Sequence, residues 1–472
     1  MQPIDRRLIE VVPSPRQIAL QQMEFYAFVH FTVNTFTDLE WGDGTESPAI
    51  FNPAKLDADQ WAQAIKAAGM KGLILTCKHH DGFCLWPSRH TAHSVAASPW
   101  KDGQGDVVAE VSAACRRAGI KFGVYLSPWD RHDPRYGTGK AYDDYFVAQL
   151  TELLTNYGEI FAVWFDGACG EGPNGKKQYY DWPRYYDTIR RLQPGTAISN
   201  CGPDARWCGN EAGDTREAEW SVVPLRMRDT DRIFNGSQQT DDAGFRLRKI
   251  TASDRDLGSR EFLAGEGELC WYPAEVDTSI RPGWFWHASE DDQVRPLDKL
   301  IDIYEKSVGG NALLLLNIPP TSEGLLHAND VKRLREIGQY LQDAYGTNLL
   351  DDSAVLTAAP GVPGHGIDCI RSEDESCYLP ACEGEPVCIT IEWPEEITFR
   401  RIVLMEQIAL SQRVERYAVD ALVNGQWQEI AAGKVIGYKR IVTLPPTTAR
   451  SIRIRIEDAR VTPTLKFTGI YA

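Results

Sequence analysis

The chain has 472 residues, 43% of them hydrophobic, and carries a formal net charge of −16 at pH 7. This negative charge argues against nucleic acid and against anionic membrane surfaces as partners. No apolar run reaches the ~18 residues that cross a membrane, and the N-terminal segment MQPIDRRLIEVVPSP contains no apolar signal core. We therefore expect a soluble protein without membrane insertion, either cytoplasmic or exported after removal of a signal. Its compartment and its oligomeric state are left open.

Residues 1–346 alternate short apolar runs with segments of helical periodicity. Five apolar runs predict strands, at 25–31, 71–79, 121–127, 161–167 and 197–202. The segments between them predict helices, at 56–70, 106–120, 142–153 and 185–195. Strands that alternate with helices form a parallel sheet with crossover connections.

The rest of this region is less regular. Residues 312–320 predict a late buried strand and 330–346 a closing helix, but long loops between about 203 and 297 prevent a clean count of eight units. We predict an α/β fold, a (β/α)8-like TIM barrel over residues 1–346. An open doubly wound sheet is the alternative, although no Gly-rich phosphate loop follows the first strand.

Residues 347–472 show a different pattern. Apolar and polar residues alternate with a period of two, no helical pattern remains, and Asn424-Gly425 is a hairpin signal. We predict a C-terminal all-β sandwich of jelly-roll type. This region also holds four of the eleven cysteines, Cys369, Cys377, Cys382 and Cys388. Their spacing lacks a CxxC motif, which favours reduced thiols over a disulfide or a metal site.

Polar side chains gather at the ends of the predicted barrel strands. They are His30, His79-His80-Asp81, Tyr125, Asp166 and Asn200. In a barrel of parallel strands the carboxyl ends meet at one rim, where active sites form. Five consecutive strands that bring polar side chains to the same rim predict a functional site there.

Two kinds of chemistry fit this rim. A metal-dependent barrel hydrolase would use histidines and an aspartate as ligands, usually beginning with two histidines one residue apart on the first strand. Here Phe31 and Thr32 follow His30 instead. Adjacent residues such as His79 and His80 also point to opposite faces of a strand unless a bulge intervenes. We therefore favour imidazoles that bind sugar hydroxyls, with no metal and no cofactor, and keep the metal-dependent hydrolase as an alternative.

Glycoside hydrolysis needs two carboxylates, and the retaining route places them roughly 5–5.5 Å apart. Asp166 follows an apolar strand and is either a helix cap or a nucleophile. Its partner must come from the loops beyond the fifth strand. The candidates are Glu211, Glu217, Glu219, Glu266, Glu268 and Glu275. Spacing does not choose among them.

Several segments resemble the α-L-fucosidases of glycoside hydrolase family 29. They are FVHFTVNTFTDLEWGDG, LTCKHHDGFCLW, YLSPWD, VWFDG, RPGWFWH and SVGGNALLLLNIPP, in the same order as in that family and over roughly residues 25–330. The resemblance implies a retaining exo-acting enzyme with Asp166 as the nucleophile. It is closer to the branch that acts on α-1,3/1,4-linked fucose, whose RWxGNExG segment matches Arg206–Gly213 and implies Glu211 as the acid/base, with Glu266 and Glu268 as fallbacks.

The resemblance also implies which residues bind fucose. They are His30, Glu40, Trp41, His79, His80, Tyr125, Trp164 and Trp284. The expected partner is a fucosylated oligosaccharide or glycoconjugate, and the C-terminal domain resembles the carbohydrate-binding-like modules that follow such barrels. A non-catalytic fucose-binding protein is a further alternative, against which the presence of both Asp166 and Glu211 argues.

Overall fold

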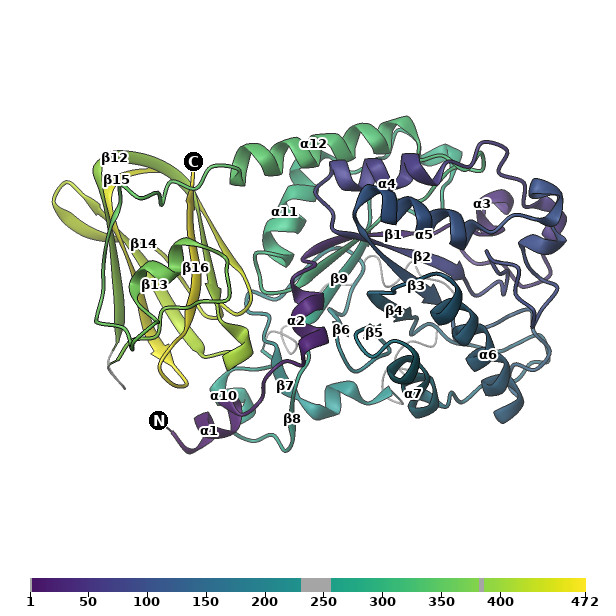
Figure 1. Ribbon diagram of the computed structural model, residues 1–472, viewed down its shortest axis with the longest axis horizontal. Coiled ribbons are helices and arrows are strands. Elements are labelled where there is room, and N and C mark those ends of the chain that lie inside the picture. Colours follow the sequence, from purple (N-terminus) through teal and green to yellow (C-terminus); the bar gives the residue numbers. More distant parts are fainter. Residues whose placement is uncertain (1, 231–255, 382–385) are drawn as a thin grey trace.

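The computed structural model describes residues 2–230, 256–381 and 386–472. It has two parts, a barrel of parallel strands at the right of Figure 1 and an antiparallel β-sandwich at the left. Helix α12 (Ala328–Tyr345) runs along the barrel toward the sandwich, where the chain passes from one part to the other. Within the described ranges, no helix is both long and apolar enough to cross a membrane.

Eight parallel strands form the barrel. In chain order they are β1 (Phe25–Val29), β2 (Gly72–Lys78), β3 (Lys121–Leu126), β4 (Ala162–Phe165), β5 (Ala197–Asn200), β6 (Arg206–Trp207), β9 (Ala274–Ser279) and β10 (Leu313–Asn317). Their order in the sheet, β5-β4-β3-β2-β1-β10-β9-β6, follows the chain around a circle. A parallel bridge between Ser199 of β5 and Ala205, just before β6, brings the two edge strands together. The barrel is nearly closed, which confirms the predicted (β/α)8-like fold and excludes the alternative fold, an open doubly wound sheet.

The predicted helices cover the outside of these strands. The longer ones are α4 (Ala58–Ala67), α5 (Val107–Ala118), α6 (Lys140–Asn156), α7 (Trp182–Leu192), α11 (Leu297–Ser307) and α12, and the short ones are α1 (Pro3–Ile9), α2 (Pro15–Gln21), α3 (Asn34–Thr37) and α10 (Arg260–Leu263). Asp57 and Asp106 cap α4 and α5 by accepting hydrogen bonds from backbone N–H groups of the first turn. Val107, Val111 and Cys115 of α5 are buried at helical spacing, as predicted.

The second half of the barrel departs from regular alternation. Residues 201–205 join β5 to β6 without a helix, and Asp204 holds this turn by accepting a hydrogen bond from the Ile198 N–H (2.8 Å) and pairing with Arg16 (3.0 Å). After β6, strands β7 (Val222–Pro224) and β8 (Leu269–Trp271) form a separate antiparallel pair. Eight barrel strands therefore form without a regular helix after each one, and for this reason the sequence does not show eight countable units.

The C-terminal part is the predicted antiparallel sandwich. Its strands are β11 (Val355–Thr357), β12 (Val387–Glu406), β13 (Val414–Val423), β14 (Gln426–Gly433), β15 (Arg440–Ala459) and β16 (Leu465–Tyr471). Asn424 and Gly425 both have positive φ, 52° and 76°, and connect β13 to β14, which confirms the predicted hairpin. The thiols of Cys369, Cys377 and Cys388 are free, and Cys382 lies outside the described residues.

A buried ion pair joins the sandwich to the barrel. Lys439, just before β15, pairs with Glu24, which directly precedes β1. Burial by itself would raise the pKa of Glu24, but Lys439 and the more exposed Lys71 outweigh it and lower that pKa to about 2. Beside this pair, the Asn311 side-chain oxygen accepts a hydrogen bond from the Tyr438 N–H (2.7 Å). The start of the first barrel strand is thus fixed by the sandwich.

A second set of contacts joins the sandwich to the loops that follow β6. The side-chain oxygen of Gln412 accepts a hydrogen bond from the Ser221 N–H (3.0 Å), and the buried guanidinium of Arg460 donates to the Gly258 carbonyl (2.6 Å). Arg260 pairs with Asp458 of β15 (2.8 Å). The loops that follow β6 therefore pack against the sandwich.

We expect Lys439→Met to destabilise the protein by about 3–5 kcal/mol, because it leaves the Glu24 carboxylate buried with only the half-exposed Lys71 beside it. Urea unfolding measures this loss. Lys466→Met is the matched control, since Lys466 is as buried as Lys439 but among the described residues pairs with the exposed Glu375 (3.6 Å), so its loss leaves no buried charge unpaired and should cost no more than about 1 kcal/mol. Equal losses for the two variants would contradict the role given to the buried pair.

Candidate active site

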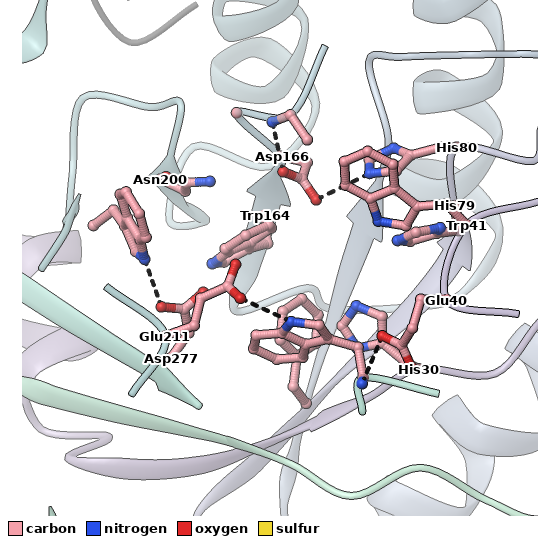
Figure 2. A pocket seen from close by; sticks show the side chains of 15 residues that line it. His30, Glu40, Trp41, His79, His80, Trp164, Asp166, Asn200, Glu211 and Asp277 are labelled. Atoms are coloured by element: carbon pink, nitrogen blue, oxygen red, sulfur yellow. Dashed lines mark hydrogen bonds and ion pairs between the residues drawn. The ribbon is translucent and has the colours of Figure 1, made fainter. Parts of the chain in front are cut away.

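A pocket opens at the carboxyl ends of the barrel strands (Figure 2). Nine of the ten predicted site residues line it, namely His30, Glu40, Trp41, His79, His80, Trp164, Asp166, Glu211 and Trp284. The tenth, Tyr125, lies behind Asp166 and contacts it. The remaining lining residues are Phe28, Gly167, Ala168, Asn200, Trp207 and Asp277. The structure thus gathers residues from both halves of the barrel around one cavity.

Asp166 follows the end of β4 and projects into this pocket. Its Oδ2 accepts a hydrogen bond from the Tyr125 hydroxyl (2.8 Å), and its Oδ1 accepts one from the Ala168 N–H (2.8 Å). Burial raises the pKa of Asp166, while these hydrogen bonds act in the opposite direction because they favour the charged form. The side chain keeps 20% of its surface exposed, so the carboxylate is held in a fixed orientation and still reachable.

Two of the three pocket histidines have their tautomers set by hydrogen bonds. His30 Nδ1 lies 2.9 Å from the side-chain oxygen of Asn317, which only accepts, so Nδ1 carries the proton. His80 Nδ1 lies 2.7 Å from the Ser127 hydroxyl, whose own proton goes to the Trp129 carbonyl (2.7 Å). In both residues Nε2 is therefore left as a hydrogen-bond acceptor.

The third histidine differs from the other two. The amide nitrogen of Asn34 approaches His79 Nδ1 at 3.5 Å, which favours a proton on Nε2. Burial lowers the pKa of all three imidazoles, that of His30 to about 4. At neutral pH the pocket thus offers uncharged acceptors from His30 and His80 and a donor from His79, a combination suited to the hydroxyl groups of a neutral ligand.

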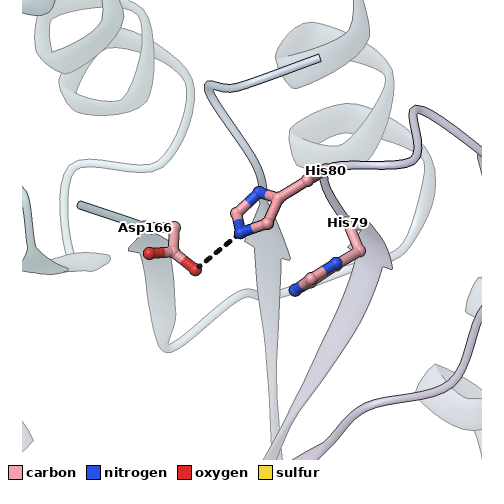
Figure 3. A group of neighbouring side chains, drawn as sticks. All are labelled: His79, His80 and Asp166. Atoms are coloured by element: carbon pink, nitrogen blue, oxygen red, sulfur yellow. Dashed lines mark ion pairs between the residues drawn. The ribbon is translucent and has the colours of Figure 1, made fainter. Parts of the chain in front are cut away.

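His79 and His80 both face the pocket, although adjacent strand residues were expected to point to opposite faces. Strand β2 ends at Lys78, and its pairing with β3 shifts register between Thr76 and Lys78, so the alternation of a regular strand does not extend to the two histidines. Figure 3 shows both rings beside Asp166. Ligand atoms of the three residues lie within 4.8 Å of one another, an arrangement that could hold a metal ion. The irregularity that was named as the exception is therefore present, and strand geometry does not exclude a metal at this position.

Glu211 lies in the loop after β6. Its Oε2 accepts a hydrogen bond from the Trp284 indole N–H (3.1 Å), and its carbonyl accepts one from the Thr278 hydroxyl (2.8 Å). The Asn210 side-chain oxygen shapes this loop by accepting from the N–H groups of Ala212 (3.0 Å) and Asp214 (3.1 Å). These contacts turn the Glu211 carboxyl into the pocket, on a different side from Asp166 (Figure 2).

Glu40 positions the segment that carries Trp284. Its two oxygens accept from the backbone N–H groups of Trp284 (2.9 Å) and Phe285 (3.2 Å), and one of them also meets His287 Nε2 at 2.7 Å. The hydrogen bond to Glu40 is the main cause that raises the pKa of His287, to about 9, with Asp38 contributing (2.6 Å). His287 is a site residue that the sequence analysis did not single out, although it ends the RPGWFWH segment.

The other glutamates considered as the second carboxylate lie elsewhere. Glu217 and Glu268 are exposed, Glu266 pairs with Arg226 at the surface, and Glu219 is buried against Arg206 (2.6 Å) and Arg216 (3.1 Å). None of them lines the pocket. Glu275 is buried inside the barrel and accepts a hydrogen bond from the Trp164 indole N–H (2.6 Å).

Asp277 and Trp207 were missed by the sequence analysis. Asp277 is two residues beyond Glu275 on β9, and Trp207 ends β6, where its indole N–H donates to Asp277 Oδ1 (2.7 Å). Both strands fall within residues 203–297, where the sequence predicted loops. The polar-apolar alternation of AEVDTS is the signal that could have revealed β9.

We expect the contribution of His287 to stability to depend on pH. Its pKa is raised above the unfolded value of ~6.5, so the stabilisation is complete below pH ~6.5 and is lost as pH rises through about 9. The melting temperature of His287→Gln, compared with wild type from pH 6 to 10, should show a deficit that shrinks across this window. A deficit independent of pH would contradict the charged His287–Glu40 contact.

Comparison with known proteins identifies the family. The sequence model of the alpha-L-fucosidase family matches residues 16–346. Alpha-L-fucosidase 1 of Arabidopsis thaliana is 38% identical over 98% of this chain and 87% of its own length. A crystal structure from Bacteroides ovatus is 45% identical with a TM-score of 0.84 and covers all of this chain and 76% of that one. A Ruminococcus gnavus fucosidase of glycoside hydrolase family 29, solved in complex with fucose, is 30% identical with a TM-score of 0.84, over 98% of this chain and 95% of that one. The chain therefore belongs to the alpha-L-fucosidases of glycoside hydrolase family 29 and is a glycoside hydrolase.

Proposed function

We propose that this α-L-fucosidase is exo-acting, removes terminal α-1,3/1,4-linked fucose and retains the anomeric configuration, with Asp166 as the nucleophile and Glu211 as the acid/base. The observation that carries the proposal is that these two carboxyl groups enter one pocket from different strand ends, surrounded by neutral histidines and by indole rings. Two carboxyl groups on either side of one bound sugar are what double displacement requires.

In the first step the Asp166 carboxylate attacks the anomeric carbon of fucose. A bond forms between that carbon and an Asp166 oxygen, the glycosidic bond breaks, and the Glu211 proton passes to the leaving oxygen. The hydrogen bonds from Tyr125 and Ala168 support this role, because they stabilise the anion and aim it into the pocket. Glu211 is positioned through its contact with Trp284.

In the second step a water molecule releases the sugar. The Glu211 carboxylate takes a proton from the water, the water oxygen bonds to the anomeric carbon, and Asp166 leaves as a carboxylate. The histidines can accept or donate hydrogen bonds to the fucose hydroxyls, while Trp164 and Trp284 offer apolar surface to its methyl group. The fucose bound by the Ruminococcus gnavus relative supports this choice of sugar.

A metal-dependent hydrolase remains the second candidate, because His79, His80 and Asp166 bring three metal-binding atoms together. EDTA separates the two readings. Activity that is unchanged after EDTA treatment supports a role for Asp166 as nucleophile. Activity that EDTA removes and zinc restores would instead support a role for Asp166 as a metal ligand. Hydrolysis of an aryl α-L-fucoside removes the third reading, a fucose-binding protein without catalysis.

We also propose that the chain divides into a catalytic unit, residues 1–346, and a carbohydrate-binding-module-like sandwich, residues 347–472. The distribution of apolar contacts supports this division. The main core of the barrel extends along the chain to Ile337, and the main core of the sandwich begins at Leu350.

Substitution of each carboxyl group should have a distinct effect. Asp166→Asn removes the charge that attacks the anomeric carbon, so turnover should fall by a factor of about a thousand or more on every fucoside. Glu211→Ala should lower turnover of an oligosaccharide by about 10²–10⁴-fold, while the first step on an aryl fucoside with an acidic phenol should be affected much less. Steady-state and burst kinetics on both substrates measure these effects.

Azide supplies the stereochemical control for the same variants. In Glu211→Ala, azide needs no general base and should restore turnover by attacking the glycosyl-enzyme on the face from which the leaving group departed, giving α-L-fucosyl azide. Azide that replaces a missing nucleophile gives the β-anomer, as expected only for Asp166→Asn. Glu266→Ala, at the surface with Arg226, should behave as wild type. A β-anomer from the Glu211 variant would reverse the two assignments.

The linkage preference can be tested with a panel of fucosylated oligosaccharides. We expect kcat/KM to be highest for α-1,3- and α-1,4-linked fucose and at least about tenfold lower for α-1,2- and α-1,6-linked fucose, a difference of roughly 1.4 kcal/mol between transition states. Equal rates across the panel would leave the α-L-fucosidase activity in place and remove the proposed linkage specificity.

A further inference from the structure

Three carboxyl groups lie in or next to the pocket without a matching positive charge, and two of them, Glu275 and Asp277, are buried. Asp166 and Asp277 line the pocket, and Glu275 lies on the same strand as Asp277. Glu275 is 2% and Asp277 3% exposed. Among the residues that the structure describes, no Lys or Arg forms an ion pair with any of the three. Three anions so placed would be costly, so at least one of these groups must hold its proton.

The number of hydrogen-bond donors around each group shows where that proton resides. Glu275 accepts from the Trp164 indole (2.6 Å) and from the Tyr26 hydroxyl. Asp166 likewise accepts two hydrogen bonds, from Tyr125 and Ala168 (both 2.8 Å). Burial raises the pKa of both groups, but their two donors oppose that shift, so each of them carries charge more readily than a carboxyl group with fewer donors.

Asp277 is less well supplied with donors. Among the described residues, the one other residue that donates a hydrogen bond to its side chain is Trp207, whose indole N–H donates to Oδ1 (2.7 Å). Glu275 and Asp277 are at positions i and i+2 of β9, so their side chains leave the strand on the same side. Burial first, and then the negative charges of Glu275 and Asp166, raise the pKa of Asp277 well above its ordinary value. Among the three groups, Asp277 is the one in which the proton is held.

We propose that Asp277 contacts the substrate as a neutral carboxylic acid, whose O–H group at Oδ2 donates a hydrogen bond to an oxygen of the bound sugar. This inference rests on the proposed function of the pocket and adds a binding residue to it. Asp277 lies on the same side of the pocket as Glu211 (Figure 2), so the sugar oxygen belongs either to fucose or to the sugar that leaves. The donor complements His30 and His80, which offer acceptors.

A neutral acid at this position also suits the proposed nucleophile. A second anion near Asp166 would disfavour the charged form of Asp166, which the attack requires. A neutral O–H group binds the substrate without that repulsion.

Asp277→Asn and Asp277→Ala test the proposal. Asparagine keeps the size, the neutrality and an N–H donor, so kcat/KM should stay within about threefold of wild type. Alanine removes the donor, so kcat/KM should fall by about 10- to 100-fold, the loss of one buried hydrogen bond. Asp166→Asn is the contrasting control, because the same change of carboxyl to amide should abolish turnover there. A loss in Asp277→Asn as large as in Asp277→Ala would show that an anion is needed and would overturn the proposal.

The choice of substrate identifies the oxygen. If the loss in Asp277→Ala occurs with an aryl α-L-fucoside, the hydrogen bond goes to fucose, and if it occurs only with an oligosaccharide, the bond goes to the leaving sugar. A loss with neither substrate overturns the proposal.

Infrared difference spectroscopy tests the protonation state without any activity. The spectrum of wild type minus Asp277→Asn at pH 7 should contain the C=O stretching band of a protonated carboxylic acid, and its absence would overturn the proposal. This measurement stays informative even if the protein proves to use another substrate. Thermal unfolding of each variant confirms that the comparison is made between folded proteins.

Discussion

The active site depends on keeping one partly buried carboxylate charged without a Lys or Arg side chain from the described pocket residues beside it. None of the described residues that line the pocket is Lys or Arg, so the charge of Asp166 depends on the hydrogen bonds from Tyr125 and Ala168, with the neutral imidazole of His80 3.7 Å away. Its donors come from β3 and from the turn after β4, and the parallel register that pairs Tyr125 with Trp164 sets their positions. The pocket histidines stay neutral because they are buried, so they add no positive charge beside Asp166. The barrel geometry thus positions the hydrogen-bond donors that favour the charged form of Asp166.

Much of this arrangement could be predicted from the sequence. The first five barrel strands were found because each is a buried apolar run that ends in a polar residue, and the closing of the parallel sheet brings those ends together. Asp166 and the histidines were placed at the rim on this ground alone. The choice of Glu211 among the six candidate glutamates came only from the resemblance to family 29, because no spacing rule links a loop residue to a strand that ends about 45 positions before it.

The rest could not be predicted, for identifiable physical reasons. Strand β6 has only two residues, too few to show a periodic pattern, and no helix between β5 and β6 marks a separate unit in the sequence. Asp277 was missed along with β9, and its proton depends on neighbours that only the folded barrel supplies. His79 and His80 share the pocket because β2 ends before them, a boundary that the uninterrupted run LILTCKHH does not reveal. Such features arise from tertiary packing rather than from local pattern.

The contacts between the sandwich and the loops after β6 bear on how this architecture can evolve and be engineered. Gln412 and Arg460 bind backbone groups of Ser221 and Gly258, which belong to the same connection as Glu211. A detachable binding module would meet its catalytic neighbour through a linker and could be exchanged between enzymes at little cost. Here the sandwich supplies hydrogen-bond partners for a loop of the barrel, so the sequences of the two parts are expected to change together. Grafting a foreign sandwich would require redesign of that loop as well.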